Sequence, residues 1–341
     1  MKKIENTKKN NFLKKLFIKL CRIIGYEIVD QSNLYLPTSE RLANQNLSVL
    51  GKKNISIPLG ETKINRPVKS LDIIIKTCTS VNLVTQNKKR VFEQNKSEYT
   101  QRTINSIINS LEFDKDNLKK IKIKIFVIDH ESNKEDLIKI KSKLDKTNFD
   151  FKIINLKLEK FNQIQIINKD NPVIEKNMRA TMSSIQESFN IAKAECSNLV
   201  YFVEDDYIHK TEALTEMLFA YEKFSSIFQN EIFILSSDYP YLYKNMNNSS
   251  ILIGENIHWR TVKESLLTFM TSRKMVEKHF EKLIDMTTKE YDPFEKNLHK
   301  IYEEEKCFSP IPSMSIHCTN INSVFGLSPN VNLKKLWDEN S

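Results

Sequence analysis

Residues 199–206 read Leu-Val-Tyr-Phe-Val-Glu-Asp-Asp, an apolar run that ends in three consecutive acids. An apolar run rich in Val and aromatic residues predicts a buried central strand, which in α/β proteins delivers its last residues to the ligand-binding edge of the sheet. Glu204, Asp205 and Asp206 would repel one another there unless positive charge lies among them. A divalent cation carrying a phosphorylated substrate would supply that charge. The alternative is a solvated acidic turn before a helix that begins near Thr211.

From residue 71 onward, strand patterns alternate with helix patterns. Strands are predicted at 71–75, 121–128, 151–156, 199–203 and 232–235. Helices are predicted at 99–111, 134–144, 178–194, 211–228, 263–270, 273–283 and 293–304. This alternation predicts an α/β fold of Rossmann-like character, with a mostly parallel sheet sandwiched by helices.

Glycine and cysteine usage excludes several kinds of site. Only five glycines occur and they are scattered, which excludes both a GxGxxG dinucleotide loop and a GxxxxGK[ST] phosphate loop. The five cysteines lack CxxC spacing, which is typical of buried thiols in a reducing compartment.

No stretch approaches the roughly 18 apolar residues of a membrane-spanning helix. Lysines interrupt the first apolar segment, so no signal peptide is expected and a cytoplasmic location is predicted.

The net charge of +9 is concentrated at the N-terminus. Residues 1–22 hold eight basic residues against Glu5, so the remaining residues carry only +2 and no nucleic-acid groove is expected. Apolar residues recur there at helical spacing with lysines between them. This pattern predicts a basic amphipathic helix over residues 1–25, whose residues 1–24 bind an anionic membrane surface from its inner face. The alternative is a helix docked on the protein's own core.

A second acidic strand end precedes the first by about seventy residues. Residues 125–132, Ile-Phe-Val-Ile-Asp-His-Glu-Ser, end a strand at Asp129. Together with residues 201–206, and after an opening βαβ pattern, this block resembles family 2 glycosyltransferases of GT-A type, whose strands end in DDxS and DxD. The resemblance covers residues 71–206 and, more loosely, residues 207–317.

The resemblance also implies a division of the chain. It implies a catalytic domain over residues 67–341, with a nucleotide-sugar half at 67–206 and an acceptor half with a C-terminal tail at 207–341. Residues 26–66 hold Pro37 and Pro58, and they are expected to form an irregular lead-in with a hairpin.

Carried over to this sequence, the resemblance implies roles for the acidic side chains. Asp129 would hold the nucleotide base or ribose, and Asp206 would be the main ligand of Mg²⁺ or Mn²⁺ on the sugar diphosphate. Glu204 would contact the donor sugar or ribose, and Asp205 beside it would belong to the donor site or serve structure. His130 stands where the family has a second aspartate, and Glu204 replaces an aspartate, so both positions depart from the family pattern.

Two further residues are candidates by position. Arg179, on the helix before the acidic strand, resembles the family's arginine near the diphosphate, a role that suits a bidentate guanidinium. The alternative is a surface arginine. His317 falls where many GT-A enzymes supply a late histidine to the metal. The alternative for His317 is a histidine that is simply hydrogen-bonded.

An inverting transfer needs a carboxylate that takes the proton of the acceptor hydroxyl. In GT-A enzymes it lies well after the metal motif, near the start of a helix. Glu295 and Asp292 match that description, although Asp292 before Pro293 could be only an N-cap. Asp238 is the competing candidate. Four aromatic residues are candidates for stacking on a sugar acceptor or for core packing: Tyr239, Tyr241, Tyr243 and Trp259.

The sequence therefore predicts a metal-dependent, inverting glycosyltransferase with Mn²⁺ or Mg²⁺ as cofactor. Its partners would be a nucleotide-sugar donor and a cell-envelope glycan or lipid-linked acceptor, the envelope being suggested by the amphipathic N-terminus. One alternative is a sugar-phosphate nucleotidyltransferase, which would be expected to carry a Gly-rich phosphate loop. The other is a catalytically silent GT-A scaffold that binds a glycan or a partner protein.

Overall fold

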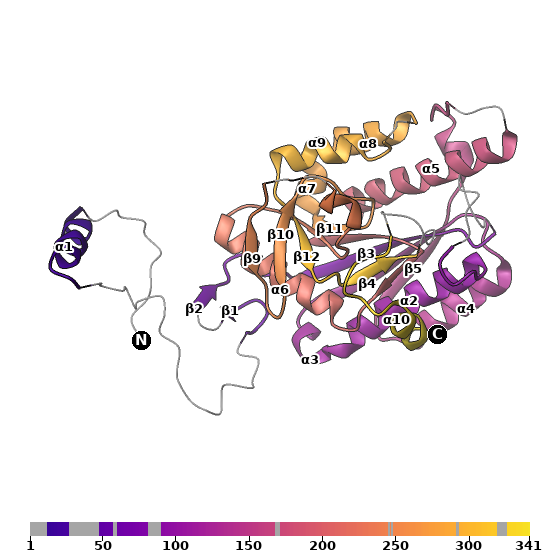
Figure 1. Cartoon of the computed structure of the whole chain (residues 1–341). Coiled ribbons are helices and arrows are strands. Elements are labelled where there is room, and N and C mark those ends of the chain that lie inside the picture. Colours follow the sequence, from indigo (N-terminus) through magenta and orange to yellow (C-terminus); the bar gives the residue numbers. More distant parts are fainter. Residues whose placement is uncertain are drawn as a thin grey trace.

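The computed structural model describes residues 12–26, 48–56, 60–80, 90–167, 171–244, 246, 248–290, 293–318 and 326–341. Its centre is a large sheet whose first half is parallel (Figure 1). That half has the order β5-β4-β3-β6, formed by β3 (Ser70–Thr77), β4 (Lys122–Asp129), β5 (Asp150–Asn155) and β6 (Leu199–Glu204). Parallel strands joined through helices place their carboxyl ends at one edge of the sheet, which is where the acidic residues lie.

The second half of the sheet is mixed. Beyond β6 the order continues β11-β8-β12-β10-β9, with β11 antiparallel to both β6 and β8 and with β8 parallel to β12. The bounds of these strands are Phe269–Ser272 for β11, Phe233–Leu235 for β8, Cys307–Ile311 for β12, His258–Val262 for β10 and Ile251–Ile253 for β9. A short separate ladder pairs β7 (Tyr207–His209) with β13 (Ser315–His317). It brings His317 back to the residues that follow the acidic strand.

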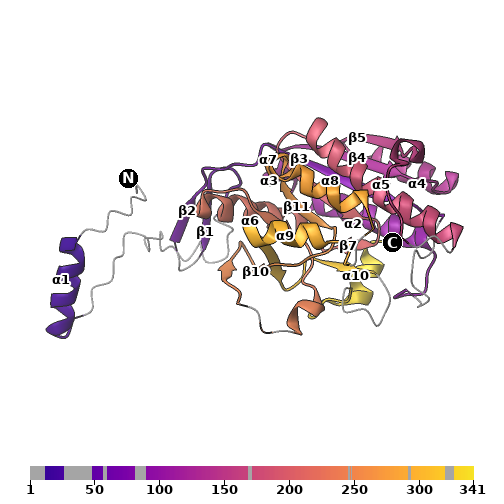
Figure 2. The same cartoon turned by 90° about the horizontal axis from the view of Figure 1, so that it is seen from above.

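Helices cover both faces of the sheet (Figures 1 and 2). One face carries α5 (Pro172–Ala194), α7 (Arg273–Lys278), α8 (Phe280–Thr288) and α9 (Lys296–Glu304). The other face carries α2 (Lys96–Phe113), α3 (Lys115–Leu118), α4 (Lys134–Leu144), α6 (Ala213–Phe228) and α10 (Leu333–Glu339). Because both faces are covered, all eight residues of β3 are buried. The predicted α/β class, with a sheet sandwiched by helices, is confirmed.

The N-terminal part contains a helix and a hairpin. Helix α1 (Phe12–Ile23) lies apart from the sheet in both views (Figures 1 and 2). The predicted hairpin is confirmed as β1 (Lys53–Ser56) paired antiparallel with β2 (Gly60–Lys63). Glu222 on α6 joins this part to the core by accepting hydrogen bonds from the backbone N–H groups of Gly51 and Val68, both at 2.6 Å. No helix within the described residues combines the length and apolar character needed to cross a bilayer.

Three helix predictions are wrong in detail. No helix forms over residues 263–270; instead, β11 begins at Phe269, which pairs with Phe202 on one side and with Leu235 on the other. Periodicity alone does not show whether a short apolar run is a buried helix or a buried strand. Here the run forms a strand because it is inserted between two other strands. The helix expected at 273–283 is broken into α7 and α8 at His279. The helix expected from Pro293 begins at Lys296, so that Glu295 is its N-cap residue.

Candidate active site

Asp129 is held rigidly at the end of β4. Its Oδ1 accepts a hydrogen bond from the Thr77 hydroxyl at 2.8 Å, and its Oδ2 accepts one from the backbone N–H of Ser132 at 3.3 Å. Thr77 is the last residue of β3 and pairs with Asp129 in the parallel register. The sheet edge therefore presents a carboxylate of fixed orientation at the end of β4, with β3 between it and the acidic strand β6.

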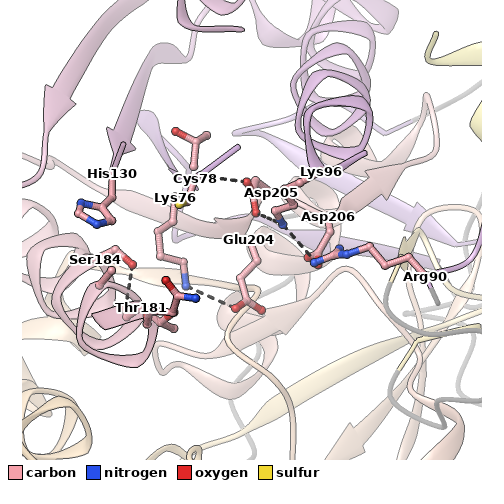
Figure 3. A pocket seen from close by; sticks show the side chains of 13 residues that line it. Lys76, Cys78, Arg90, Lys96, His130, Thr181, Ser184, Glu204, Asp205 and Asp206 are labelled. Atoms are coloured by element: carbon pink, nitrogen blue, oxygen red, sulfur yellow. Dashed lines mark hydrogen bonds and ion pairs between the residues drawn. The ribbon is translucent and has the colours of Figure 1, made fainter. Parts of the chain in front are cut away.

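A pocket opens at this edge between the strand ends and α5 (Figure 3). Helix α5 contributes four residues of one face at helical spacing, the polar Asn177, Thr181 and Ser184 and the apolar Ala180. His130 lines the same pocket, and burial lowers its pKa, which favours the uncharged ring. The cavity of about 190 Å³ is smaller than the roughly 300–1,000 Å³ of pockets that enclose drug-sized ligands. Within the described residues it can enclose only part of a nucleotide sugar.

The acidic triplet meets basic side chains, and the first of these is Lys76 near the end of β3. Its Nζ lies 3.7 Å from Glu204 Oε1, and both residues line the pocket. Lys76 and Glu204 are direct neighbours in the parallel pairing of β3 and β6. Their side chains therefore leave adjacent strands side by side and point into the same space (Figure 3).

The second basic side chain is Lys96, the first residue of α2. Its Nζ lies 2.5 Å from Asp205 Oδ1 and 3.7 Å from Asp206 Oδ2. Asp205 Oδ2 accepts further hydrogen bonds from the Thr100 hydroxyl at 2.8 Å and from the backbone N–H of Cys78 at 3.3 Å. Burial acts against the charge of Lys96, but the nearby Asp205 and Asp206 outweigh it and raise the pKa of Lys96. Lys96 is therefore a buried, charged ammonium.

The third is Arg90, whose Nη1 donates to Asp206 Oδ2 at 2.9 Å. On the other oxygen of Asp206, His317 Nε2 lies 3.4 Å from Oδ1, with its ring stacked on Tyr207. Burial alone would raise the pKa of Asp206, but Lys96, His317 and Arg90 together lower it well below its usual range. The structure thus brings Asp206 and His317 together, as the sequence led us to expect, within an ion-pair network that also includes basic residues.

This donor set does not fit a resident divalent cation. A metal needs carboxylate oxygens at about 2.0–2.2 Å, and both oxygens of Asp205 and of Asp206 face cationic or hydrogen-bonding groups of the chain itself. Among the described residues, no group of three or more His, Cys, Asp and Glu side chains is arranged to hold a metal ion. Metal ligation by Asp206 and His317 stays a prediction from sequence.

Glu295 is the N-cap residue of α9 and is not among the residues that line the pocket. Its burial raises the pKa of its carboxyl group to about 7. The charge of Glu204 acts in the same direction, whereas His317 and Lys76 partly offset it. These interactions place Glu295 in the electrostatic environment of the acidic strand end, with a pKa suited to proton transfer near neutral pH.

Asp238, the competing candidate, is enclosed in the protein. It forms an ion pair with Arg260 at 2.7 Å, and its carboxylate accepts hydrogen bonds from Tyr243 and from the Ser309 hydroxyl. Only 2% of its side chain is exposed, so it has no path to an acceptor hydroxyl in this arrangement. Asp292 lies outside the described residues.

Arg179 points away from the pocket. Its Nη1 donates to the backbone carbonyl of Ile164 at 2.8 Å, and its Nη2 pairs with Glu175 at 3.1 Å. The pocket-lining residues of α5 occupy the opposite face of the helix, because Arg179 is two residues beyond Asn177. The sequence placed Arg179 on the correct helix, but the structure does not bring it to the other candidates.

The four aromatic candidates divide between core and surface. Tyr239 and Trp259 are fully buried, with Tyr239 hydrogen-bonded to Tyr207 at 2.9 Å, and they serve the core. Tyr243 is about half exposed under the guanidinium of Arg260. Tyr241 is partly buried, and the charge of Glu295 contributes to raising its pKa, although burial is the larger cause.

The sequence analysis missed Lys76, Arg90 and Lys96. A signal existed for Lys96, because it lies four residues before Thr100 and eight before Ile104, which is the spacing of residues on one face of a helix. Lys76 stands at the end of an apolar strand, where a ligand-facing residue is expected. Nothing local distinguishes Arg90, which reaches Asp206 only through the tertiary fold.

No protein-family model matches the sequence, and no curated protein matches it. Solved structures of glycosyltransferases are similar to the chain at low identity. The Staphylococcus aureus TarS fragment 1–349 is 12% identical, with a TM-score of 0.35, over 62% of this chain and 49% of that one. The galactosyltransferase LgtC, solved with donor and acceptor sugar analogues, is 10% identical, with a TM-score of 0.35, over 67% of this chain and 70% of that one.

A UDP-glucose pyrophosphorylase is similar as well, at 9% identity and a TM-score of 0.40, over 79% of this chain and 97% of that one. The similar structures thus include GT-A glycosyltransferases, the class that the sequence motifs resemble. The chain spans about half the length of the TarS fragment. Likenesses this distant carry no conclusion about activity, which has to come from the site itself.

Proposed function

We propose that this protein is a glycosyltransferase that moves a sugar from a nucleotide-diphosphate donor to a hydroxyl acceptor. One observation carries the proposal. Charged side chains converge at the carboxyl edge of the parallel strands, where Glu204, Asp205 and Asp206 meet Lys76 and Lys96 around an open pocket. A polar, charged cavity at this edge is where α/β proteins hold phosphorylated ligands.

On the donor side, Asp129 and Glu204 are the proposed contacts. Asp129 accepts hydrogen bonds from Thr77 and from the backbone of Ser132, so its carboxylate is oriented before a donor arrives. Glu204 reaches into the pocket beside Lys76, at a distance of 3.7 Å. Asp129 would bind the ribose or base, and Glu204 would bind the donor sugar.

On the acceptor side, Glu295 is the proposed general base of an inverting transfer. A base works best when its pKa lies near the working pH, and burial raises the pKa of Glu295 to about 7. The bond from the anomeric carbon to the diphosphate oxygen breaks, and its electron pair stays on that oxygen. The acceptor oxygen forms the new bond to the anomeric carbon and releases its proton to Glu295.

The proposed acceptor is a cell-envelope glycan or lipid-linked saccharide at an anionic membrane surface. Helix α1 exposes apolar side chains, with Phe17 and Ile23 exposed at 59% and 72%, and Lys19 and Arg22 lie among them. An amphipathic helix of this kind binds the interface of an anionic bilayer. Mn²⁺ or Mg²⁺ has no step in this proposal, because the carboxylates already pair with basic residues.

A thermal-shift screen of nucleotide sugars on the full chain tests the proposal. A ligand that binds only the folded state raises its melting temperature, so one class of nucleotide sugar should raise it and the others should not. The reaction of the bound nucleotide sugar then distinguishes the two enzyme classes. A glycosyltransferase releases a nucleoside diphosphate, whereas a nucleotidyltransferase running in reverse turns over the nucleotide sugar only by consuming pyrophosphate. A screen in which no nucleotide sugar shifts the melting temperature, with or without Mn²⁺, would contradict the proposal.

A further inference from the structure

The three acids at the end of β6 are matched by three basic residues of the same chain. Lys76 pairs with Glu204 and Arg90 with Asp206, while Lys96 lies between Asp205 and Asp206. The basic residues come from three places: the end of β3, the segment before α2, and the first turn of α2. All three basic residues line the pocket, and Figure 3 shows them converging on the acidic triplet from different sides.

Because of this pairing, the acidic triplet does not need a metal ion to neutralise its charge. Arg90 Nη1 lies 2.9 Å from Asp206 Oδ2, and Lys96 Nζ lies 3.7 Å from the same oxygen. A divalent cation at that oxygen would be a few ångströms from two positive charges, which repel it. The triplet and its partners sum to zero charge, so the site already has the balance that a metal would otherwise provide.

We propose that Lys76, Arg90 and Lys96 bind the diphosphate of the donor in place of a divalent metal, as hydrogen-bond donors and local positive charges. The proposal rests on the function proposed above. A nucleoside diphosphate gains negative charge as its bond to the sugar breaks, and fixed cations aimed at that charge lower the barrier. Arg90 can bind phosphate oxygens in a bidentate manner, and the lysines act as point charges. Glu204, Asp205 and Asp206 hold the three cations in place before the donor arrives.

Calorimetric titration of the full chain with UDP tests this, in EDTA and then in MnCl₂. We expect UDP, or GDP or dTDP if the base differs, to bind with equal affinity, within about threefold, in both buffers. In EDTA, Lys96→Met and Arg90→Gln should each weaken binding by about 10- to 100-fold, the typical effect of losing a hydrogen bond to a charged group. Mn²⁺ alone should leave the melting temperature of the wild-type protein unchanged.

The matched control is Lys122→Met, which removes an exposed lysine at the opposite end of β4 and should bind as the wild type does. Lys96 is buried, so Lys96→Met/Asp205→Asn, which removes both charges together, provides a second variant if the single one does not fold. Nucleotide binding that requires Mn²⁺ and is unchanged in Arg90→Gln would overturn this inference and leave the proposed function standing. Absence of binding for all three nucleotides in both buffers would overturn both.

Discussion

The ammonium of Lys96 lies 2.5 Å from the Asp205 carboxylate, with the side chains of both residues about 10% exposed. This ion pair ties the first turn of α2 to the residue after β6. Thr100, one turn further along α2, donates to the other oxygen of the same carboxylate. The pair therefore both joins two elements of the core and supplies charge to the pocket.

Lys96→Met should lower the free energy of unfolding by about 3–5 kcal/mol, because it leaves Asp205 buried without its main counter-charge. Adding Asp205→Asn to the same chain should recover a large part of that loss, since the unpaired charge is then gone. Urea unfolding of the two variants and of the exposed control Lys122→Met measures this. Equal stability of Lys96→Met and Lys122→Met would contradict the ion pair.

Glu295→Gln should reduce sugar transfer by about 10²- to 10⁴-fold, the usual contribution of a general base, while nucleotide affinity stays within about threefold. Single-turnover transfer and calorimetry separate the two effects. Glu303→Gln, an exposed residue of the same helix, is the matched control and should transfer normally.

Asp238→Asn distinguishes the two base candidates. Because Asp238 pairs with Arg260 inside the protein, its substitution should lower stability and leave the rate of the folded enzyme near that of the wild type. If Asp238→Asn lost transfer while keeping its melting temperature, and Glu295→Gln did not lose transfer, then Asp238 would be the base.

The transfer rate should fall about tenfold per pH unit below about pH 7 and level off above it, because the carboxylate form of Glu295 accepts the proton. The free energy of unfolding should change with pH in the opposite direction to the transfer rate. The pKa of Glu295 is raised from an ordinary 4.5. Its contribution to the free energy of unfolding is therefore fully present below pH 4.5 and is lost as the pH rises through about 7. Glu295→Gln should therefore gain stability over the wild type in alkaline buffer. If the transfer rate of Glu295→Gln still fell below about pH 7, the titrating group would be a residue other than Glu295.

Lys19→Gln/Arg22→Gln should weaken sedimentation with phosphatidylglycerol vesicles by about tenfold or more, since each basic residue near an anionic surface contributes about 1 kcal/mol. Removal of residues 1–26 should abolish it and leave nucleotide binding unchanged. Phosphatidylcholine vesicles serve as the neutral control. Equal sedimentation of the wild type and of the shortened chain would show that α1 does not act on membranes.

Several parts of this architecture could be predicted from local spacing. The apolar runs that end in Asp129 and Glu204 are strands of the parallel half of the sheet, because continuous burial on both faces selects such runs. The same reasoning could not find β11, whose four residues become a strand only between β6 and β8. It also placed Arg179 on a helix without revealing which face of that helix would meet the pocket.

The sequence by itself determined an α/β chain with an acidic strand end and a carboxylate near the start of a late helix, since periodicity and short motifs are local properties. Only the tertiary structure decided what neutralises those acids. Thr100 and Asp205 are separated by 105 residues, and Lys96 and Arg90 reach the triplet because α2 packs against the residues that follow β6. Which charges meet at such a site depends on packing across the chain, and no spacing within one segment encodes it.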